Sequence, residues 1–425
     1  MTRLLLAATA AALLFAPAPP QTTAATVAFT GVRLIDGRST APVDNAVVVV
    51  RDGRIAAAGA AGTVQPPPEA TIVDLAGQSM IPGLITTHAH IVASDMRGTR
   101  PRAYTDETTE WQLTLFARHG VTTVWSLGGE QAAAFRARDV QATPGLQRSR
   151  IFVAGDVIAA KTPDEARQRV AAVAAQKPDI VKIRVDDNLG TSAKMTPEVY
   201  RAVIDEAHAR GLRVAAHIFY LDDAKALVRA GADVIAHSVR DRDVDDELIQ
   251  LMRSSGAPYI PTLTRELSTF VYESRPAFFD DPLFVRHADP AVVARLEEPA
   301  RQEAMRASKS ARAYKAGLEV AKRNLKRLAD AGVLIAMGTD SGATPERFPG
   351  YFEHLEMEMM AEAGMTPAQI LRAATSDAAR AMRMNDAGAI VPGAWADLVV
   401  VDRDPLADIR HTRAIRSVWI AGNRR

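Results

Sequence analysis

The stretch Gly83-Leu84-Ile85-Thr86-Thr87-His88-Ala89-His90 is a mostly apolar run that closes on two histidines. A short apolar run of this length is typical of a buried strand. Side chains alternate along a strand, so His88 and His90 point to the same side. Both imidazoles can therefore reach one metal ion at about 2.0–2.1 Å, although two surface histidines would follow the same pattern.

Similar runs recur downstream and alternate with helical patterns. Seven further strand-like runs lie at residues 121–127, 151–154, 180–185, 212–218, 234–237, 259–263 and 334–338. Helical stretches separate most of them, for example at 163–176, 197–210, 222–230 and 310–331. Eight strands with intervening helices predict an α/β fold, a (β/α)₈ TIM barrel. An insert at about 265–309 is expected to be helical and to cover the barrel mouth.

The segments on either side of this region are rich in β signals. Residues 47–50 are four valines, and the turn Asp52-Gly53 leads into a second apolar run. Residues 397–402 and 417–423 also have strand patterns. We therefore expect a small β-sandwich built from both chain ends, with an N-terminal part at 26–80 and a C-terminal part at 386–425. The barrel would occupy residues 81–385.

The first 25 residues differ from the rest in composition. Arg3 supplies a positive start, residues 4–15 are apolar, and small residues and prolines follow. The apolar run is too short for a transmembrane helix, which needs about 20 residues. The pattern predicts a cleaved signal peptide at 1–25 and a periplasmic or secreted protein with no membrane span after cleavage. An uncleaved membrane anchor is the alternative.

Bulk composition excludes several classes of function. The chain has 425 residues, long enough for one large domain and a smaller one. A net charge of +1 provides no basic excess for nucleic acid, so the expected partner is a small-molecule substrate. There are no cysteines, which rules out disulfides and zinc–thiolate sites. The oligomeric state is not indicated.

Ionisable residues lie within or at the ends of four further predicted strands. They are Lys182, His217, His237 and Asp340. A lysine inside an apolar strand is costly unless it is paired or neutralised. In a TIM barrel, residues at the C-terminal ends of the strands converge on the active site. We therefore expect these four side chains to join His88 and His90 there.

These residues and their flanks resemble the amidohydrolase superfamily, in its imidazolonepropionase-like and prolidase-like (Xaa-Pro dipeptidase-like) branch. The flanking motifs are Ile81-Pro82-Gly83-Leu84-Ile85, Gly120-Val121-Thr122-Thr123-Val124, Gly364-Met365-Thr366-Pro367, Ala373-Ala374-Thr375, Gly388-Ala389-Ile390 and Ala396-Asp397-Leu398-Val399-Val400. The resemblance covers nearly all of the chain after residue 25. It implies a metal-dependent hydrolase, usually of amide-type bonds, with a β-sandwich beside the barrel.

The resemblance also implies a role for each ionisable residue. His88 and His90 would bind the more buried ion together with Asp340, and His217 and His237 would bind a second. A carboxylated Lys182 would bridge the two divalent ions. We expect Zn²⁺, although the ligands also suit manganese, iron and cobalt. An unmodified Lys182 beside a single ion is the alternative.

The expected reaction is hydrolysis of an amide C–N bond by a metal-activated water, with Asp340 as general base and then acid. A dipeptide or an N-acyl amino acid is the expected substrate, and a cyclic amide, a lactone or an ester is the alternative. Where relatives often have a glycine-rich stretch, Arg184 is followed by Val185-Asp186-Asp187. Arg184 could pair with these aspartates or hold a substrate carboxylate. Tyr220 and His354 are the other candidate substrate contacts.

Overall fold

The computed structural model describes residues 26–39, 41–91 and 104–425. The predicted signal peptide at 1–25 lies outside these residues. No helix within the described part of the chain is both long and apolar enough to cross a membrane.

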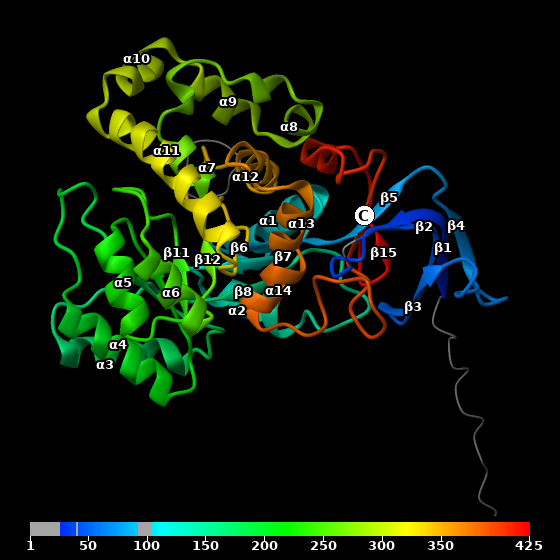
Figure 1. Cartoon of the computed structure of the whole chain (residues 1–425), viewed down its shortest axis with the longest axis horizontal. Coiled ribbons are helices and arrows are strands. Elements are labelled where there is room, and N and C mark those ends of the chain that lie inside the picture. Colours follow the sequence, from blue (N-terminus) through cyan, green and yellow to red (C-terminus); the bar gives the residue numbers. More distant parts are fainter. Residues whose placement is uncertain (1–25, 40, 92–103) are drawn as a thin grey trace, which may run out of the picture.

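Strands from both chain ends form one sheet, at the right of Figure 1. They are β1 (Val27–Leu34), β2 (Val43–Arg51), β3 (Arg54–Ala60), β4 (Thr71–Asp74), β5 (Ser79–Pro82), β13 (Leu398–Val401), β14 (Ile415–Ile420) and β15 (Asn423–Arg424). The order is β15-β14-β13-β5-β1-β2-β3, and β4 pairs with β1. Strand β5 joins the two ends, because Met80 aligns with Leu34 of β1 and with Val400 of β13. The turn between β2 and β3 has positive φ at Asp52 and Gly53, as a tight hairpin requires.

The central strands are parallel and lie in two sheets. One sheet contains β6 (Leu84–Ala89), β7 (Val121–Ser126) and β8 (Arg150–Val153); the other contains β9 (Val181–Arg184), β10 (Val214–His217), β11 (Val234–Ala236) and β12 (Tyr259–Ile260). Single bridges connect them at Ile158–Ile183 on one side, and at Tyr259–Ile335 and Ala89–Ser341 on the other. The two sheets are therefore linked at both edges.

The predicted strand at 334–338 is not a regular strand. Ala336 N donates to Tyr259 O, but the next N–H, that of Met337, donates to Ala373 O. Because the peptide after Ala336 turns to another partner, the pairing with β12 stops after one bridge. The prediction of extended backbone therefore fits Ile335, whereas a full strand was wrong.

Helices connect and cover the parallel strands (Figure 1). They are α1 (Asp106–Arg118), α2 (Ala132–Asp139), α3 (Pro163–Ala175), α4 (Pro197–Ala209), α5 (Leu221–Arg229), α6 (Asp246–Ser255), α11 (Lys309–Asp330), α12 (Tyr351–Glu362), α13 (Pro367–Ala373) and α14 (Ser376–Met382). Several begin at a residue whose side chain accepts a backbone N–H, as Thr162 does at α3 and Asp245 at α6. The predicted helices at 163–176, 197–210, 222–230 and 310–331 match α3, α4, α5 and α11 closely.

The insert is helical, as predicted, and most of it forms a lobe at the top of Figure 1, above its first helix. Its elements are α7 (Leu263–Leu267), the 3₁₀ turns Val271–Glu273 and Ala277–Asp280, α8 (Pro282–His287), α9 (Pro290–Leu296) and α10 (Pro299–Ala307). Outside the insert, a 3₁₀ turn lies near the C-terminus at Ile409–Arg413. Its aromatic residues pack with Phe348, Tyr351 and Phe352, around the start of α12. The insert thus packs against the segment that follows Asp340.

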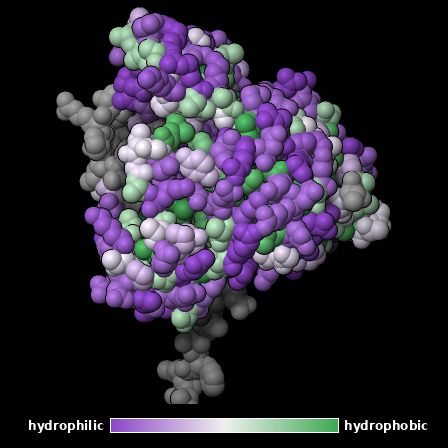
Figure 2. Space-filling view, turned by 60° about the vertical axis from the view of Figure 1, so that its left-hand side comes forward, coloured by the Kyte–Doolittle hydropathy of each residue, from purple (hydrophilic) through white to green (hydrophobic). Residues whose placement is uncertain are grey.

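The outer surface is mostly hydrophilic, and Figure 2 shows only small, scattered hydrophobic areas on the face in view. Among the described residues the large hydrophobic side chains that are exposed lie far apart in the sequence, at Ile72, Val140, Val157 and Val285. Isolated exposed residues of this kind are normal on a folded protein.

Candidate active site

The structure brings together all six residues that we predicted as metal ligands. His88 lies on β6, Lys182 on β9 and His217 at the end of β10. His90 and His237 directly follow β6 and β11, and Asp340 directly precedes the bridge residue Ser341. His88 Nε2 is 3.3 Å from Asp340 Oδ1 and 3.4 Å from Lys182 Nζ. The rings of His88 and His237 are 4.5 Å apart between centroids, and those of His237 and His217 are 4.0 Å apart.

Three of these ligands form a compact group by themselves. One nitrogen each of His88 and His90 and one carboxylate oxygen of Asp340 lie within 4.8 Å of one another. His90 Nε2 is only 2.8 Å from Asp340 Oδ1. Two imidazoles and a carboxylate are a common donor set for zinc and related divalent ions. These residues could therefore hold a metal.

Hydrogen bonds fix the orientation of three of the four imidazoles. His90 Nδ1 donates to Gly128 O at 3.0 Å, and His217 Nε2 donates to Asp186 Oδ2 at 2.8 Å. His237 Nδ1 is 2.7 Å from Thr262 Oγ1. Each bond uses one ring nitrogen, so the other nitrogen, Nε2 of His90 and His237 and Nδ1 of His217, is the one that could bind a metal ion. In this structure His90 Nε2 contacts Asp340 Oδ1. Metal-binding histidines usually have such a partner on the second nitrogen.

The backbone at the site is held in an unusual conformation. His237, Thr262 and Asp340 have φ values of 73°, 50° and 62°. For residues with a side chain, the left-handed region costs roughly 1–2 kcal/mol each. Strained residues of this kind gather at functional sites, where the surrounding structure holds them in place. His237 and Thr262 come just after the parallel strands β11 and β12, and Asp340 lies between the bridges at Ile335 and Ser341.

Burial favours the neutral form of four of the predicted nitrogen ligands, His88, His217, His237 and Lys182. His90 differs: burial opposes its charge, but the hydrogen bond with Asp340 and the charge of that carboxylate raise its pKa. Burial, with a contribution from the charge of Lys182, lowers the pKa of His88 to about 3. Burial also lowers the pKa values of His217 and His237 well below the ordinary value. Lys182 is 3% exposed, and burial lowers its pKa to about 7. Neutral imidazoles and a neutral amine are the forms that can act as ligands or react with carbon dioxide.

Asp340, by contrast, stays ionised. Burial opposes its charge, but Arg347 and the hydrogen bonds to His88 and His90 hold its pKa well below the usual range. Arg347 Nη1 donates to Oδ2, the oxygen that faces away from the histidines. Buried Glu353 accepts from the hydroxyls of the neighbours Thr339 and Ser341, each at 2.7 Å, and so fixes the backbone around Asp340.

Four supporting residues were not predicted from the sequence: Asp186, Thr262, Arg347 and Glu353. For Asp186 a signal was present, because an aspartate four residues after the buried Lys182 is placed near the end of the same strand. It was considered only as a partner for Arg184. Arg347 lies in the loop 342–350, which has no recognisable motif, so only the fold reveals its contact with Asp340.

Two of the three predicted substrate contacts lie close to this group. The Arg184 side chain is 42% exposed, lies 3.5 Å from Asp186 Oδ2 and also contacts the Asn188 side chain. It borders a cavity of about 550 Å³ that Asp186 and Lys194 also line. Tyr220 donates its hydroxyl to Asp187 Oδ1 at 2.8 Å.

His354 lies elsewhere, and this differs from our expectation. It is 2% exposed on α12, with Nδ1 3.0 Å from Thr412 Oγ1 and Nε2 2.9 Å from His119 O. The carbonyl can only accept, so Nε2 donates there. Both ring nitrogens are thus engaged in joining α12 to its neighbours, and we leave His354 out of the candidate site.

The family of the chain is shown by its match to known proteins. The profile of the amidohydrolase family matches residues 79–425, which includes every residue of the group described above. The chain belongs to the amidohydrolase family. It is a hydrolase that acts on carbon–nitrogen bonds, and the resemblance noted from its motifs is confirmed.

Individual relatives cover much of the chain. Imidazolonepropionase of Mycolicibacterium smegmatis is 27% identical over 384 residues, which is 84% of each chain. Ochratoxinase of Aspergillus niger is 26% identical over 282 residues, 63% of this chain and 51% of that one. A crystal structure from Bifidobacterium longum, provisionally described as a prolidase, superposes with a TM-score of 0.78 at 25% identity and covers 95% of both chains. These amidohydrolase relatives thus differ among themselves in the substrates that their names specify.

Proposed function

We propose that this protein is an exported metal-dependent amidohydrolase that cleaves the amide C–N bond of a small substrate, such as a dipeptide or an N-acyl amino acid. The observation that carries the proposal is the convergence of His88, His90 and Asp340, each with a donor atom within 4.8 Å of the others. Their neighbours Lys182, His217 and His237 extend the donor set toward a second ion.

The proposed site holds two divalent ions, with zinc as the expected metal. His88, His90 and Asp340 would hold the first ion, and His217 Nδ1 and His237 Nε2 the second. Lys182, with a pKa of about 7, has a substantial neutral fraction at neutral pH and can add carbon dioxide. The resulting carbamate would offer one anionic oxygen to each ion. When bound, the ions activate a water and polarise the substrate carbonyl.

Asp340 is the proposed proton shuttle. The reaction adds water across the C–N bond, so one proton must travel from the water to the leaving nitrogen. Asp340 is ionised and would accept this proton and then donate it to the amine, as a general base followed by a general acid. Arg347 keeps the carboxylate oriented through its contact with Oδ2.

Arg184 and Tyr220 are proposed to bind the substrate. A guanidinium at the edge of a cavity can hold a carboxylate through two parallel hydrogen bonds. The Arg184 side chain is 42% exposed, its ion pair with Asp186 is long at 3.5 Å, and its contact with Asn188 lies at the surface, so Arg184 can turn toward a substrate. The free carboxylate of a dipeptide or an N-acyl amino acid suits this position.

The proposal also includes the domain organisation of the chain. The two parallel sheets, linked at both edges and completed by the bridge at Ile335, would form one closed (β/α)₈ barrel over residues 81–385. Residues 26–80 and 386–425 would form the β domain beside it. A signal peptide at 1–25 would direct the protein to the periplasm or the medium. Protein isolated from the native host should then begin between about residues 18 and 27.

Metal analysis combined with a substrate panel tests the function. We expect about two divalent ions per chain and turnover of a dipeptide or an N-acyl amino acid ahead of a cyclic amide, a lactone or an ester. His88→Ala should lose metal and activity together. His208→Ala is the matched control, because His208 is 42% exposed and pairs with Asp233 outside the site. Full metal content and full turnover in His88→Ala would refute the proposal.

A further inference from the structure

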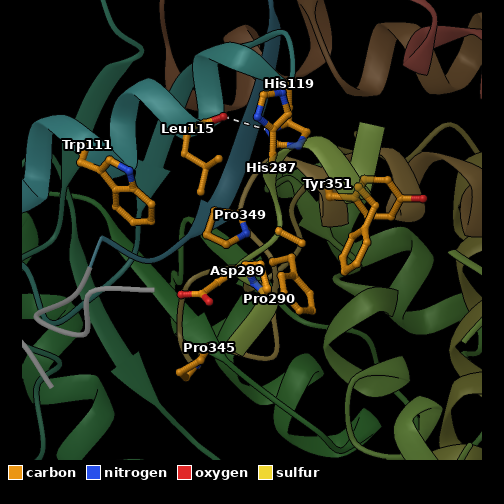
Figure 3. A pocket seen from close by; sticks show the side chains of 12 residues that line it. Trp111, Leu115, His119, His287, Asp289, Pro290, Pro345, Pro349 and Tyr351 are labelled. Atoms are coloured by element: carbon orange, nitrogen blue, oxygen red, sulfur yellow. Dashed lines mark hydrogen bonds between the residues drawn. The ribbon is translucent and has the colours of Figure 1, made fainter. Parts of the chain in front are cut away.

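The ring of His90 is oriented by a carbonyl in a loop that is distant in the sequence. His90 Nδ1 donates to Gly128 O at 3.0 Å, 38 residues away. His119 is held more simply, because its Nδ1 donates to Leu115 O of the preceding helix α1 at 2.9 Å, as the dashed line in Figure 3 shows. A helix keeps its own carbonyls in a regular array. The loop that carries Gly128 has to be held by other contacts.

The buried side chain of Glu130 supplies these contacts. It is 3% exposed, and its Oε1 accepts from Gly128 N at 2.8 Å and from the Ser126 hydroxyl. Its Oε2 accepts from Ala154 N at 3.1 Å and from Gly155 N at 2.7 Å. Burial raises the pKa of Glu130, while hydrogen bonds from these donors favour the ionised form. The carboxylate thus ties the loop after β7 to the loop after β8.

One oxygen of this carboxylate holds His90 from two sides. Glu130 Oε1 fixes the Gly128 peptide, whose carbonyl accepts from the His90 ring. The same oxygen accepts from the Ser126 hydroxyl, and Ser126 Oγ in turn accepts from Ile91 N at 2.9 Å. Ile91 is the residue after His90. The ring and the adjoining backbone of this histidine therefore both depend on Glu130 Oε1.

We propose that Glu130 is a positioning residue for the metal site, which fixes the Gly128 carbonyl and through it the ring of His90, so that Nε2 faces the first ion. This inference rests on the metal role proposed for His90. A partner behind a metal-binding histidine sets the orientation and the tautomer of its ring, and its loss weakens metal affinity about 10- to 100-fold. Because Glu130 acts through Gly128, we expect an effect of about ten-fold.

Glu130→Gln breaks this connection selectively. The substitution replaces one oxygen by an NH₂ group of nearly the same size. At the Oε2 position both neighbours, Ala154 N and Gly155 N, are donors and cannot accept from the amide. At the Oε1 position the Ser126 hydroxyl can accept. The amide should therefore keep its oxygen on the β8 loop, and Gly128 N should lose its acceptor.

Two measurements test the proposal. In a series of zinc buffers, full metal occupancy of Glu130→Gln should require about ten-fold more free zinc than that of the parent. Excess zinc should then restore most of the rate, because no reacting group has changed. In the metal-free protein, hydrogen exchange followed by NMR should show faster exchange of the Gly128 amide, with Ala154 and Gly155 still protected. Zinc affinity within two-fold of the parent, or unchanged protection of Gly128, would overturn the proposal.

Asp397→Asn is the matched control for the loss of a buried carboxylate. Asp397 is 7% exposed, accepts from Ala421 N at 2.7 Å and pairs at 2.9 Å with Arg150, the first residue of β8. This variant should have a lower melting temperature and the zinc affinity of the parent. An equal loss of zinc affinity in both variants would assign the effect to general destabilisation and reject the role of Glu130.

A milder variant keeps the test decisive if Glu130→Gln does not fold. In Ser126→Ala, Glu130 Oε1 can still hold Gly128 N, so the Gly128 amide should stay protected while the Ile91 amide exchanges faster. Loss of protection at Gly128 would mean that the hydroxyl holds the loop, and would overturn the proposal. Failure of the proposed function has a different signature, because the parent protein would then bind no divalent ion. Exchange of the Gly128 amide would still show whether Glu130 fixes the loop.

Discussion

Asp186 offers a sharp test of how the second metal position is built. Its side chain is fully buried, and its two oxygens have different partners. Oδ2 accepts from His217 Nε2 at 2.8 Å, and Oδ1 accepts from Asn188 N at 2.9 Å. In Asp186→Asn the amide oxygen can keep the contact with Asn188 N. The amide NH₂ would then face His217, which must turn Nε2 into an acceptor and carry its proton on Nδ1. That proton blocks the nitrogen that would bind the metal.

The expected magnitude follows from the position of Asp186 behind a ligand. Loss of such a partner typically weakens metal affinity 10- to 100-fold, which is about 1.4–2.8 kcal/mol. His88, His90 and Asp340 do not contact Asp186, so the first ion should remain. Metal content measured over a series of zinc buffers should therefore fall from two ions to one at a free zinc concentration that saturates the parent protein.

A neighbouring variant controls for the change of charge. Asp187 accepts from Gly190 N and from the Tyr220 hydroxyl and has no contact with the predicted metal ligands, so Asp187→Asn should keep both ions. The reasoning about His217 fails if Asp186→Asn binds both ions within two-fold of the parent affinity. It also fails if Asp187→Asn loses the second ion to the same extent. Melting temperatures in excess zinc confirm that both variants are folded.

Three further predictions concern the centre of the site. Lys182→Ala should lose the second ion and most activity, and a short carboxylic acid in the buffer should partly restore the rate; a mass spectrum of fully active enzyme with an unmodified amine and one ion would contradict the bridge. In the metal-free protein, the pKa of Lys182 is lowered from 10.5 to about 7, so the unfolded state binds more protons between these values. Stability measured by denaturant titration should rise with pH through this window, and Lys182→Met should remove that rise; an unchanged slope would show that Lys182 is not the source. Asp340→Asn should keep part of the metal but lower kcat by about 10²- to 10⁴-fold, and a rate within three-fold of the parent would assign the proton transfer to another residue.

Local patterns predicted the parts of this protein that depend on neighbouring residues in the chain. The period of two in the run ending at His90 placed two histidines on one side of a strand, and apolar runs of four to eight residues marked the parallel strands. Helices with a capping residue, such as α3 after Thr162, were predicted closely because their signals are local in sequence. The same reasoning failed at 334–338, where the partner of the Met337 N–H lies on a distant segment at Ala373.

The order of residues along the chain specifies which side chains stand at the strand ends, and these side chains identify the family. It specifies the metal-donor set only as a list of residues. Tertiary structure decided how those side chains are held. Asp186 forms a hydrogen bond with His217, 31 residues away in the sequence, and Thr262 forms one with His237, 25 residues away. For His354 the position in the sequence was misleading. It follows the loop after Asp340, but both of its ring nitrogens form hydrogen bonds away from the candidate site, with Thr412 and His119. Such contacts form only when loops that are distant in sequence lie close together in the folded protein. A periodic pattern along the chain does not indicate which loops these are.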